Sequence, residues 1–440
     1  MIKKLTSLST KLSLNRNYAN ALITGYGLMG VTIAVQLFLT PLYLTYLGRE
    51  KFGVLVMIMA ANNYAAIGIG WLTGGMARIL AERSALNDVE GFRVGYAFAK
   101  WLHLCYALFA LLVFWSISPW ILESSYSDPE IFYAVILSSL YFILVYEYST
   151  DRIAFDARKL QSKGNLREVA GQLIFACCVL MGLHAGWGLP GVVGAQVAGV
   201  VVNRVLAWHF WQQDSYQVKW TMSDNTFHGL WRRISGKMGR DYIIFGVLML
   251  TLQADILVLG WLAGPETAAI YYLLWRIPEI FILLSSRIPG SYGPFLIAME
   301  TRGERDALIK NYRRGLYLMM GLAGSAAVIY GAVGSQILEL WVGPIAPQES
   351  LPYVMSAGAM FFLVIARWPI NIAYTLLNTS PLIKILATEA ILKIAIATLF
   401  FSKFDFLSPI LAIILVHALG VSFLYLRLGQ KSVQKINFSL

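Results

Sequence analysis

A few ionisable residues lie inside long apolar stretches of the sequence. Arg276, Glu279 and Arg287 occur within the apolar run 267–298, and Asp255 lies in the run before it. An ionised side chain near the centre of a bilayer costs roughly 2.5–3.5 kcal/mol on insertion scales, so such residues tend to face a cavity or a partner. A guanidinium group stays charged and can donate two hydrogen bonds to phosphate oxygens. Binding of a phosphorylated ligand is therefore one chemistry that these residue types would allow.

The spacing of these residues gives them a common geometry. Arg276 and Arg287 are eleven residues apart, close to three full helical turns, so both lie on one stripe of a helix. Glu279, three residues from Arg276, can pair with it. Two interpretations are open: a cationic cavity wall for a diphosphate, or an internal salt bridge with Arg287 reaching for the membrane interface. Asp255 and Glu279 are candidates for coupling to a proton or sodium ion, the alternative being a static ion pair with Arg276.

Other polar residues within the apolar runs have weaker patterns. Asn62 and Asn63 lie mid-span, where they can contact sugar hydroxyls or bond to a neighbouring helix, which is the more common role. Arg78, near the cytoplasmic end of its run, either meets a ligand headgroup on entry or anchors the helix at the interface. Glu389 and Lys393 are four residues apart and are expected to pair with each other.

The sequence has no recognisable catalytic constellation. It holds no Walker A sequence, no Gly-x-Ser-x-Gly and no His-Glu-x-x-His. Its five histidines pair with no Cys or carboxylate at metal-ligand spacing, and its three cysteines lie in apolar runs. We therefore expect no enzyme activity, no metal, no cofactor and no disulfide framework.

The composition predicts that these residues belong to an all-α integral membrane protein. Of 440 residues, 58% are hydrophobic and only 13% are charged, with a net charge of +11. This balance argues against a soluble enzyme, a disordered chain and a nucleic-acid binder. About twelve apolar runs are long enough for membrane-spanning helices. They are 19–47, 52–80, 95–122, 130–152, 166–184, 188–211, 241–263, 267–298, 315–334, 350–377, 381–401 and 405–426.

The arrangement of the runs predicts two similar halves. The longest polar stretch, 212–240, separates six runs from six, so we expect lobes at 1–211 and 241–440 with a cytoplasmic linker between them. Lys and Arg are concentrated in alternate connections, which places both termini in the cytoplasm. Leu47 to Glu50 lines up with Ala263 to Glu266 at an offset of 216 residues. Since six is even, this is a parallel repeat, with a tight turn at Gly-x-Glu in each half.

Two segments resemble Wzx-type polysaccharide flippases of the multidrug/oligosaccharidyl-lipid/polysaccharide (MOP) exporter superfamily. They are Pro-Leu-Tyr-Leu-Thr-Tyr-Leu-Gly-Arg-Glu-Lys-Phe-Gly at 41–53 and Ile-Leu-Glu-Leu-Trp-Val-Gly at 337–343. The resemblance covers nearly the whole chain in span order. It implies two six-helix lobes around a central cavity lined by helices 1, 2, 7 and 8. Related lipid II flippases have arginines in the first helix, but the run 19–47 has none, so that binding pattern does not carry over.

The resemblance also implies a function. We expect a flippase in the bacterial cytoplasmic (inner) membrane that carries an undecaprenyl-diphosphate-linked oligosaccharide, such as an O-antigen repeat unit, to the periplasmic leaflet. Its substrate-binding residues would be Arg276, Arg287, Arg78, Asn62 and Asn63, and its partners would include a coupling ion and polysaccharide polymerases. The alternative is a multidrug or cation antiporter of the same superfamily.

Overall fold

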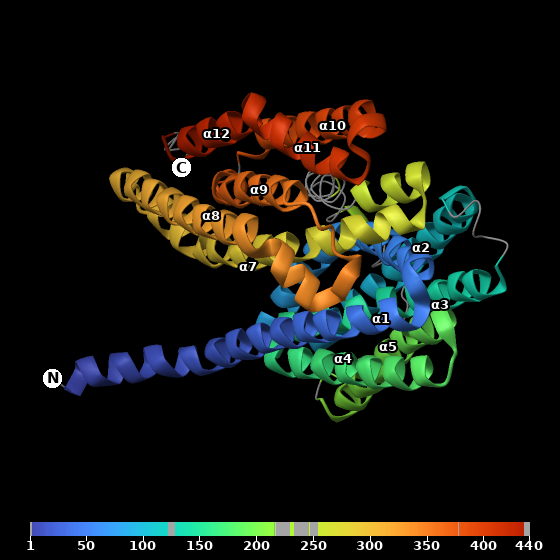
Figure 1. Ribbon diagram of the computed structural model, residues 1–440. Helices are drawn as coiled ribbons and strands as arrows, with labels where there is room; N and C mark the ends of the chain where they lie inside the picture. The colour runs from blue at the N-terminus through green and yellow to red at the C-terminus, as the bar shows by residue number, and fades with distance from the viewer. Residues whose placement is uncertain are drawn as a thin grey trace. The chain divides into compact units, whose positions relative to one another are not determined.

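The computed structural model of the chain is almost entirely helical (Figure 1). It describes residues 2–121, 128–214, 216, 229–232, 246, 254–376 and 378–434. Within these ranges no residue is in a β-strand, and nine helices are long and apolar enough to cross a membrane. A helix satisfies its own backbone hydrogen bonds, as hydrocarbon requires. The predicted all-α membrane class is confirmed.

The helices follow the order of the predicted spans. They are α1 (Ile2–Ala85), α2 (Val89–Ile121), α3 (Pro129–Ala157), α4 (Gln161–His184), α5 (Gly188–Gln213), α7 (Pro265–Thr301), α8 (Arg305–Val342), α9 (Leu351–Thr375), α10 (Thr379–Phe404), α11 (Ser408–Val416) and α12 (Ser422–Gln434). A shorter apolar helix, Ala254–Ala263, precedes α7; the rest of the predicted seventh span lies largely outside the described residues. The apolar stretch Ile23–Asn63 contains parts of two predicted spans, and Thr379–Gln434 contains two predicted spans in full.

A glycine with positive φ lies at the predicted turn in each half. Gly48 interrupts α1 with φ 75° and ψ 174°, and Gly264, its partner in the predicted repeat, has φ 87°. Glycine adopts such angles without a steric penalty. Tyr43 and Phe52 are nine residues apart and would lie on opposite sides of a straight helix, yet their rings stack at 6.3 Å. The chain therefore folds back at Gly48, as the sequence predicts.

The chain divides into two compact units, Met1–Tyr242 and Ile243–Leu440. In the first, α1 packs against α2, α3 and α4, and α4 packs along α5; in the second, α7 and α8 pack against α9, and α10 packs along α11. Helix α2 begins at Val89 and α8 at Arg305, which is again an offset of 216 residues. The two units thus share an order of helices, and this supports the predicted repeat.

The linker predicted at 212–240 lies mostly outside the described residues, so the lobe boundaries stay a prediction. Two of its described residues, Tyr216 and Leu230, are buried in a core cluster of the first unit. Arg93 donates a hydrogen bond to the Tyr216 carbonyl at 2.7 Å. At least part of this polar stretch is therefore attached to the first unit.

Small residues set the distance between α4 and α5. A Cβ atom on Gly171 would lie 2.9 Å from the Gly199 carbonyl oxygen, and one on Gly199 would lie 2.9 Å from the Gly171 carbonyl oxygen. Lipid tails are as apolar as leucine, so membrane helices associate through close packing rather than through the hydrophobic effect. Glycine at both positions lets the two backbones touch.

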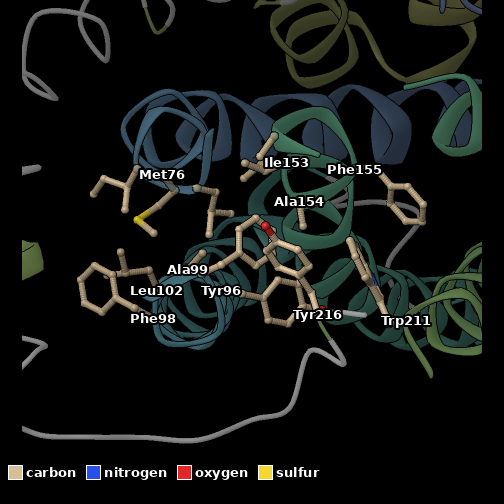
Figure 2. Packing of buried hydrophobic residues seen from close by; sticks show 14 of the residues in the cluster. Met76, Tyr96, Phe98, Ala99, Leu102, Ile153, Ala154, Phe155, Trp211 and Tyr216 are labelled. Atoms are coloured by element: carbon tan, nitrogen blue, oxygen red, sulfur yellow. The ribbon is translucent and has the colours of Figure 1, made fainter. Parts of the chain in front are cut away.

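An aromatic cluster joins helices of the first unit (Figure 2). Within it, the rings of Phe155 and Trp211 lie 4.9 Å apart. Beside it, the fully buried carboxylate of Asp151 accepts hydrogen bonds from the Tyr96 hydroxyl at 2.6 Å and the Trp211 indole at 3.0 Å. Arg204 forms a salt bridge with the same carboxylate at 2.7 Å. A buried charge is tolerated when it is paired and hydrogen-bonded, and here it ties α2, α3 and α5 together.

Candidate functional site

Arg276 lies in the middle of the membrane-spanning part of α7, Pro265–Gly290. Its Nη1 is 2.7 Å from Glu279 Oε2, and the two side chains are 11% and 25% exposed. The guanidinium also lies over the Tyr272 ring, with 5.5 Å between Cζ and the ring centroid. Its Nε is buried without a hydrogen-bond partner. The expected pair with Glu279 is thus present, and it leaves donors of the guanidinium available, because that group has five N–H bonds.

Arg287 lies on the same uninterrupted helix but in different surroundings. Eleven residues of α-helix rise about 16 Å, so Arg287 lies near the other end of the span from Pro265. Its side chain is exposed. Among the residues that the structure describes, it forms no ion pair. The two arginines share a helix stripe, as predicted, but only Arg276 is held by a carboxylate.

Asp255 is buried and belongs to a contact that joins three helices. Its Oδ2 accepts a hydrogen bond from the Tyr271 hydroxyl at 2.7 Å and forms a salt bridge with Lys393 Nζ at 2.7 Å. The Lys393 and Asp255 side chains are 2% and 6% exposed. The sequence predicted neither partner: the pairing considered for Asp255 was with Arg276. The two opposite charges compensate each other, whereas burial of either charge alone would be costly.

Glu389 differs from the sequence prediction as well. The salt bridge of Lys393 is to Asp255, whereas Glu389 contacts His417 and Tyr425 on the following helices. The Glu389 Oε1 to His417 Nε2 distance is 3.3 Å, and Oε2 accepts a hydrogen bond from the Tyr425 hydroxyl. The i,i+4 spacing made a Glu389–Lys393 pair available, but neighbouring helices supplied closer partners.

The predicted site residues of the first unit have modest contacts. Asn62 accepts a hydrogen bond from the Ser138 hydroxyl on α3 at 3.2 Å, in keeping with a helix-to-helix role. Asn63 is exposed. Arg78, near the end of α1, pairs with Glu82 at 3.0 Å, and its side chain is 68% exposed. The partners of Asn62 and Arg78, which are Ser138 and Glu82, are not among the predicted site residues.

Arg367 in α9 is a candidate that the sequence did not single out. Its Nε is buried and has no hydrogen-bond partner, and the residue is only partly exposed. It forms no ion pair with any residue in the described ranges. The sequence analysis left it out because it lies near a predicted span end, where arginines commonly reach for the interface. The available signal was that Pro369 follows it within an apolar helix.

Comparisons with known proteins bear on the fold. No protein-family model matches the sequence, and no curated protein matches it. Solved structures do match along almost the whole chain. One is a MATE transporter in the bent conformation, with a TM-score of 0.67 and 12% identity, covering 96% of each chain.

Two further matches broaden the group. The lipid II flippase MurJ in an inward closed conformation has a TM-score of 0.67 and 10% identity, covering 94% of this chain and 89% of its own. An outward-facing multidrug resistance MATE family transporter of the MOP superfamily has a TM-score of 0.65 and 14% identity, covering 95% and 96%. These neighbours are transporters and flippases rather than enzymes. The protein is therefore a multi-pass membrane protein with the fold of MOP-superfamily transporters.

Proposed function

We propose that this protein is a flippase for a lipid-linked oligosaccharide. Its substrate would be an undecaprenyl-diphosphate-linked repeat unit, of O-antigen or a related surface polysaccharide, carried from the cytoplasmic to the periplasmic leaflet by alternating access and ion coupling. The fold supports transport in general. The choice of an anionic lipid headgroup rests on the charges within the second unit.

The observation that carries the proposal is a surplus of cations within these spans. Three carboxylates that are not exposed lie in the helix Ala254–Ala263, in the span Pro265–Gly290 of α7 and in α10, and each has a cationic or titratable partner: Asp255 with Lys393, Glu279 with Arg276, and Glu389 with His417. A fourth, Glu266, is exposed in the first turn of α7. Within the described residues, neither Arg287 nor Arg367 forms a salt bridge, although the charge of Glu389 acts on Arg367. The guanidinium groups of Arg287 and Arg367 therefore stand outside the salt bridges of these spans.

Guanidinium groups suit a diphosphate better than a cationic drug. Arg276 is held in place by Glu279, and the tether uses Nη1 alone, so the remaining N–H groups can donate to phosphate oxygens. A bilayer interior strengthens such contacts because little water screens them. The lipid headgroup would bring negative charge to the guanidinium groups of this helix. Arg287 and Arg367 would add charge along the path, with Arg78, Asn62 and Asn63 contacting the headgroup or sugars.

The test is export of surface polysaccharide by cells whose own flippase has been replaced by this protein. Arg276→Ala should abolish export while the protein still reaches the membrane, because both the tethered guanidinium and its charge are lost. Arg276→Lys should retain part of the activity, since the charge and the Glu279 pair survive while the planar fork does not. Lys403→Ala is the control, because this exposed lysine lies at the far end of α10. Normal polysaccharide in Arg276→Ala cells would refute the role of Arg276.

The second candidate function is a multidrug or cation antiporter. The solved structures that match include a multidrug resistance MATE family transporter, so the fold is equally suited to that role. Such a cavity needs a carboxylate available for a cationic drug, and the carboxylates named above are already engaged. Drug resistance in sensitive cells discriminates the two functions. Resistance that survives Arg276→Ala but is lost in Glu279→Gln would favour the antiporter.

A further inference from the structure

A buried glutamate and histidine meet at a break in the last membrane-spanning segment. Glu389 comes from α10, and His417 is the first residue of the π-helical turn η3 (His417–Val421), between α11 and α12. Their side chains are 6% and 1% exposed, with 3.3 Å between Oε1 and Nε2. The Tyr425 hydroxyl donates to the other carboxylate oxygen. Both residues lie within the apolar stretch Thr379–Gln434, where an ionisable residue is expensive and commonly functional.

The hydrogen bonds around His417 suit two protonation states of the ring. A carboxylate only accepts, so the ring must donate to Glu389 from Nε2. On the other side, His417 Nδ1 lies 3.0 Å from Ser422 Oγ. A hydroxyl both donates and accepts. Ser422 can therefore donate to Nδ1 of the neutral ring, or accept from Nδ1–H of the imidazolium after its hydroxyl has rotated. The ring gains or loses a proton without leaving any of these groups unpaired.

Among the described residues, His103 is the other buried histidine, and its surroundings differ from those of His417. His103 in α2 is fully buried, and its Nδ1 lies 2.6 Å from Thr150 Oγ1. Its Nε2 is buried and has no hydrogen-bond partner. An imidazolium there would hold an unsatisfied, charged N–H group, and such a group carries the full desolvation penalty. His103 is thus confined to one charge state by its surroundings, and it provides a matched control for His417.

The ionisable groups around the pair come from three helices. Arg367 of α9 interacts with Glu389 through its charge. Lys393, one turn from Glu389 on α10, also acts on it through its charge while pairing with Asp255. Tyr425 of α12 is the third, and α11 carries no ionisable residue. With neutral His417 the formal charges of Asp255, Lys393, Arg367 and Glu389 cancel, so one added proton changes the cluster from neutral to cationic.

Two features link this proton to the shape of the helix. Gly420, inside the π-helical turn, has φ 145° and ψ −15°, which interrupts the helix between α11 and α12. Turns of this kind are frequent at functional sites. The Phe362 ring of α9 is stacked on His417, with centroids 5.9 Å apart and planes 15° apart. An aromatic face favours a cation above it. A change of charge on His417 thus acts at the joint of a broken helix.

We propose that the Glu389–His417 pair is the proton-binding site of this transporter, and that Ser422 passes the proton to and from His417. Ser422 is partly exposed whereas His417 is buried, and its hydroxyl lies within hydrogen-bond distance of the ring. The assignment of the proton as coupling ion rests on the proposed transport function. The sequence predicted Asp255 and Glu279 as the coupling carboxylates, but they form salt bridges with Lys393 and Arg276.

The binding step is tested without any substrate. The full-length protein, with 15N-labelled histidine rings, is placed in lipid nanodiscs, and ring spectra are recorded from pH 8 to pH 5. We expect one buried ring to pass from neutral to doubly protonated, and that signal should be absent from His417→Gln. The His103 ring, identified by the signal that is missing from the His103→Gln spectrum, should stay neutral over the whole pH range. A His417 ring that keeps one state over this range, in protein that is still folded, would overturn the proposal.

Ser422 gives a milder pair of variants. Ser422→Ala removes the hydroxyl and should lower the charged fraction of His417 at pH 5, whereas Ser422→Thr keeps the hydroxyl and should behave like the native protein. Equal titration of the two variants would contradict the role of Ser422.

The coupling role is tested separately, by polysaccharide export in cells. Export should fall in both His417→Gln and Ser422→Ala, and unchanged export in both would overturn coupling through this pair. Normal export in the Arg276→Ala variant would count against the diphosphate site. That result would not change the histidine spectra of the native protein, so failure of the diphosphate site and failure of the proton site are distinguishable.

Discussion

Removing one partner of the Asp255–Lys393 salt bridge should be among the most destabilising single substitutions in the second unit. It joins the helix Ala254–Ala263 to α10 at 2.7 Å with both side chains almost fully buried, and Tyr271 of α7 donates to the same oxygen. The perturbation is Lys393→Met, which keeps the apolar stem and removes the ammonium. Asp255 is then a buried carboxylate with a single neutral donor, Tyr271, among the partners that the structure defines.

The magnitude follows from that burial. Removing one member of a buried ion pair costs about 3–5 kcal/mol, because the other charge stays desolvated without compensation. At about 2–4 °C per kcal/mol for a unit of this size, the melting temperature should fall by about 10 °C. Asp255→Asn should cost a similar amount. The double variant removes both charges, so its loss should be smaller than the sum of the two by about 1–3 kcal/mol.

Thermal unfolding of the purified full-length protein in nanodiscs, followed by tryptophan fluorescence, measures these differences. Lys403→Met is the matched control, since it makes the same substitution at an exposed position of the same helix. It should stay within about 0.5 kcal/mol of the native protein. Equal melting of Lys393→Met and Lys403→Met would refute the reasoning, as would a double variant whose loss equals the sum.

Two further predictions concern packing and pH. A Cβ on Gly315 would lie 1.9 Å from Trp368, whose indole is held by a hydrogen bond to the Tyr312 carbonyl at 3.0 Å, so Gly315→Ala should cost about 1–3 kcal/mol in thermal unfolding. Gly321→Ala in the same helix meets no atom within 4 Å and should be neutral or stabilising; similar losses in both would be inconsistent with this packing. Asp88 accepts from the Gly91 backbone N–H and from Arg83, which together lower the pKa of its carboxyl below the ordinary 3.8. The stability that these contacts give the folded protein is complete above pH 3.8 and is lost as the pH falls through the lowered pKa. The difference in melting temperature between native and Asp88→Asn protein should therefore shrink in acid. A difference that stays constant would contradict this role of Asp88.

Much of the architecture could be predicted because it depends on properties of one chain segment at a time. Apolar length predicts a spanning helix, and Gly48 and Gly264 mark turns because only a residue without a side chain takes their φ angles easily. The depth of Arg276 in its helix is likewise a matter of counting residues. Its pair with Glu279 was predictable because three residues on a helix bring two side chains together.

The partners of the remaining buried charges could not be predicted in this way. Helical spacing brings Lys393 near Glu389, but the lysine forms its salt bridge with Asp255, 138 residues away in sequence. His417 became a partner of Glu389 only because α11 and α12 are broken at η3 and return beside α10. Periodicity lists the neighbours available within a helix and gives no information on which residue of another helix faces them.

The sequence by itself determined that the chain is a membrane-spanning helical protein, where its turns fall and how deep its charges lie, because each of these follows from composition and spacing along the chain. Only the tertiary structure decided which carboxylates are neutralised by lysine or arginine and which one faces a histidine, because that depends on helices distant in sequence packing closely enough for their buried side chains to meet.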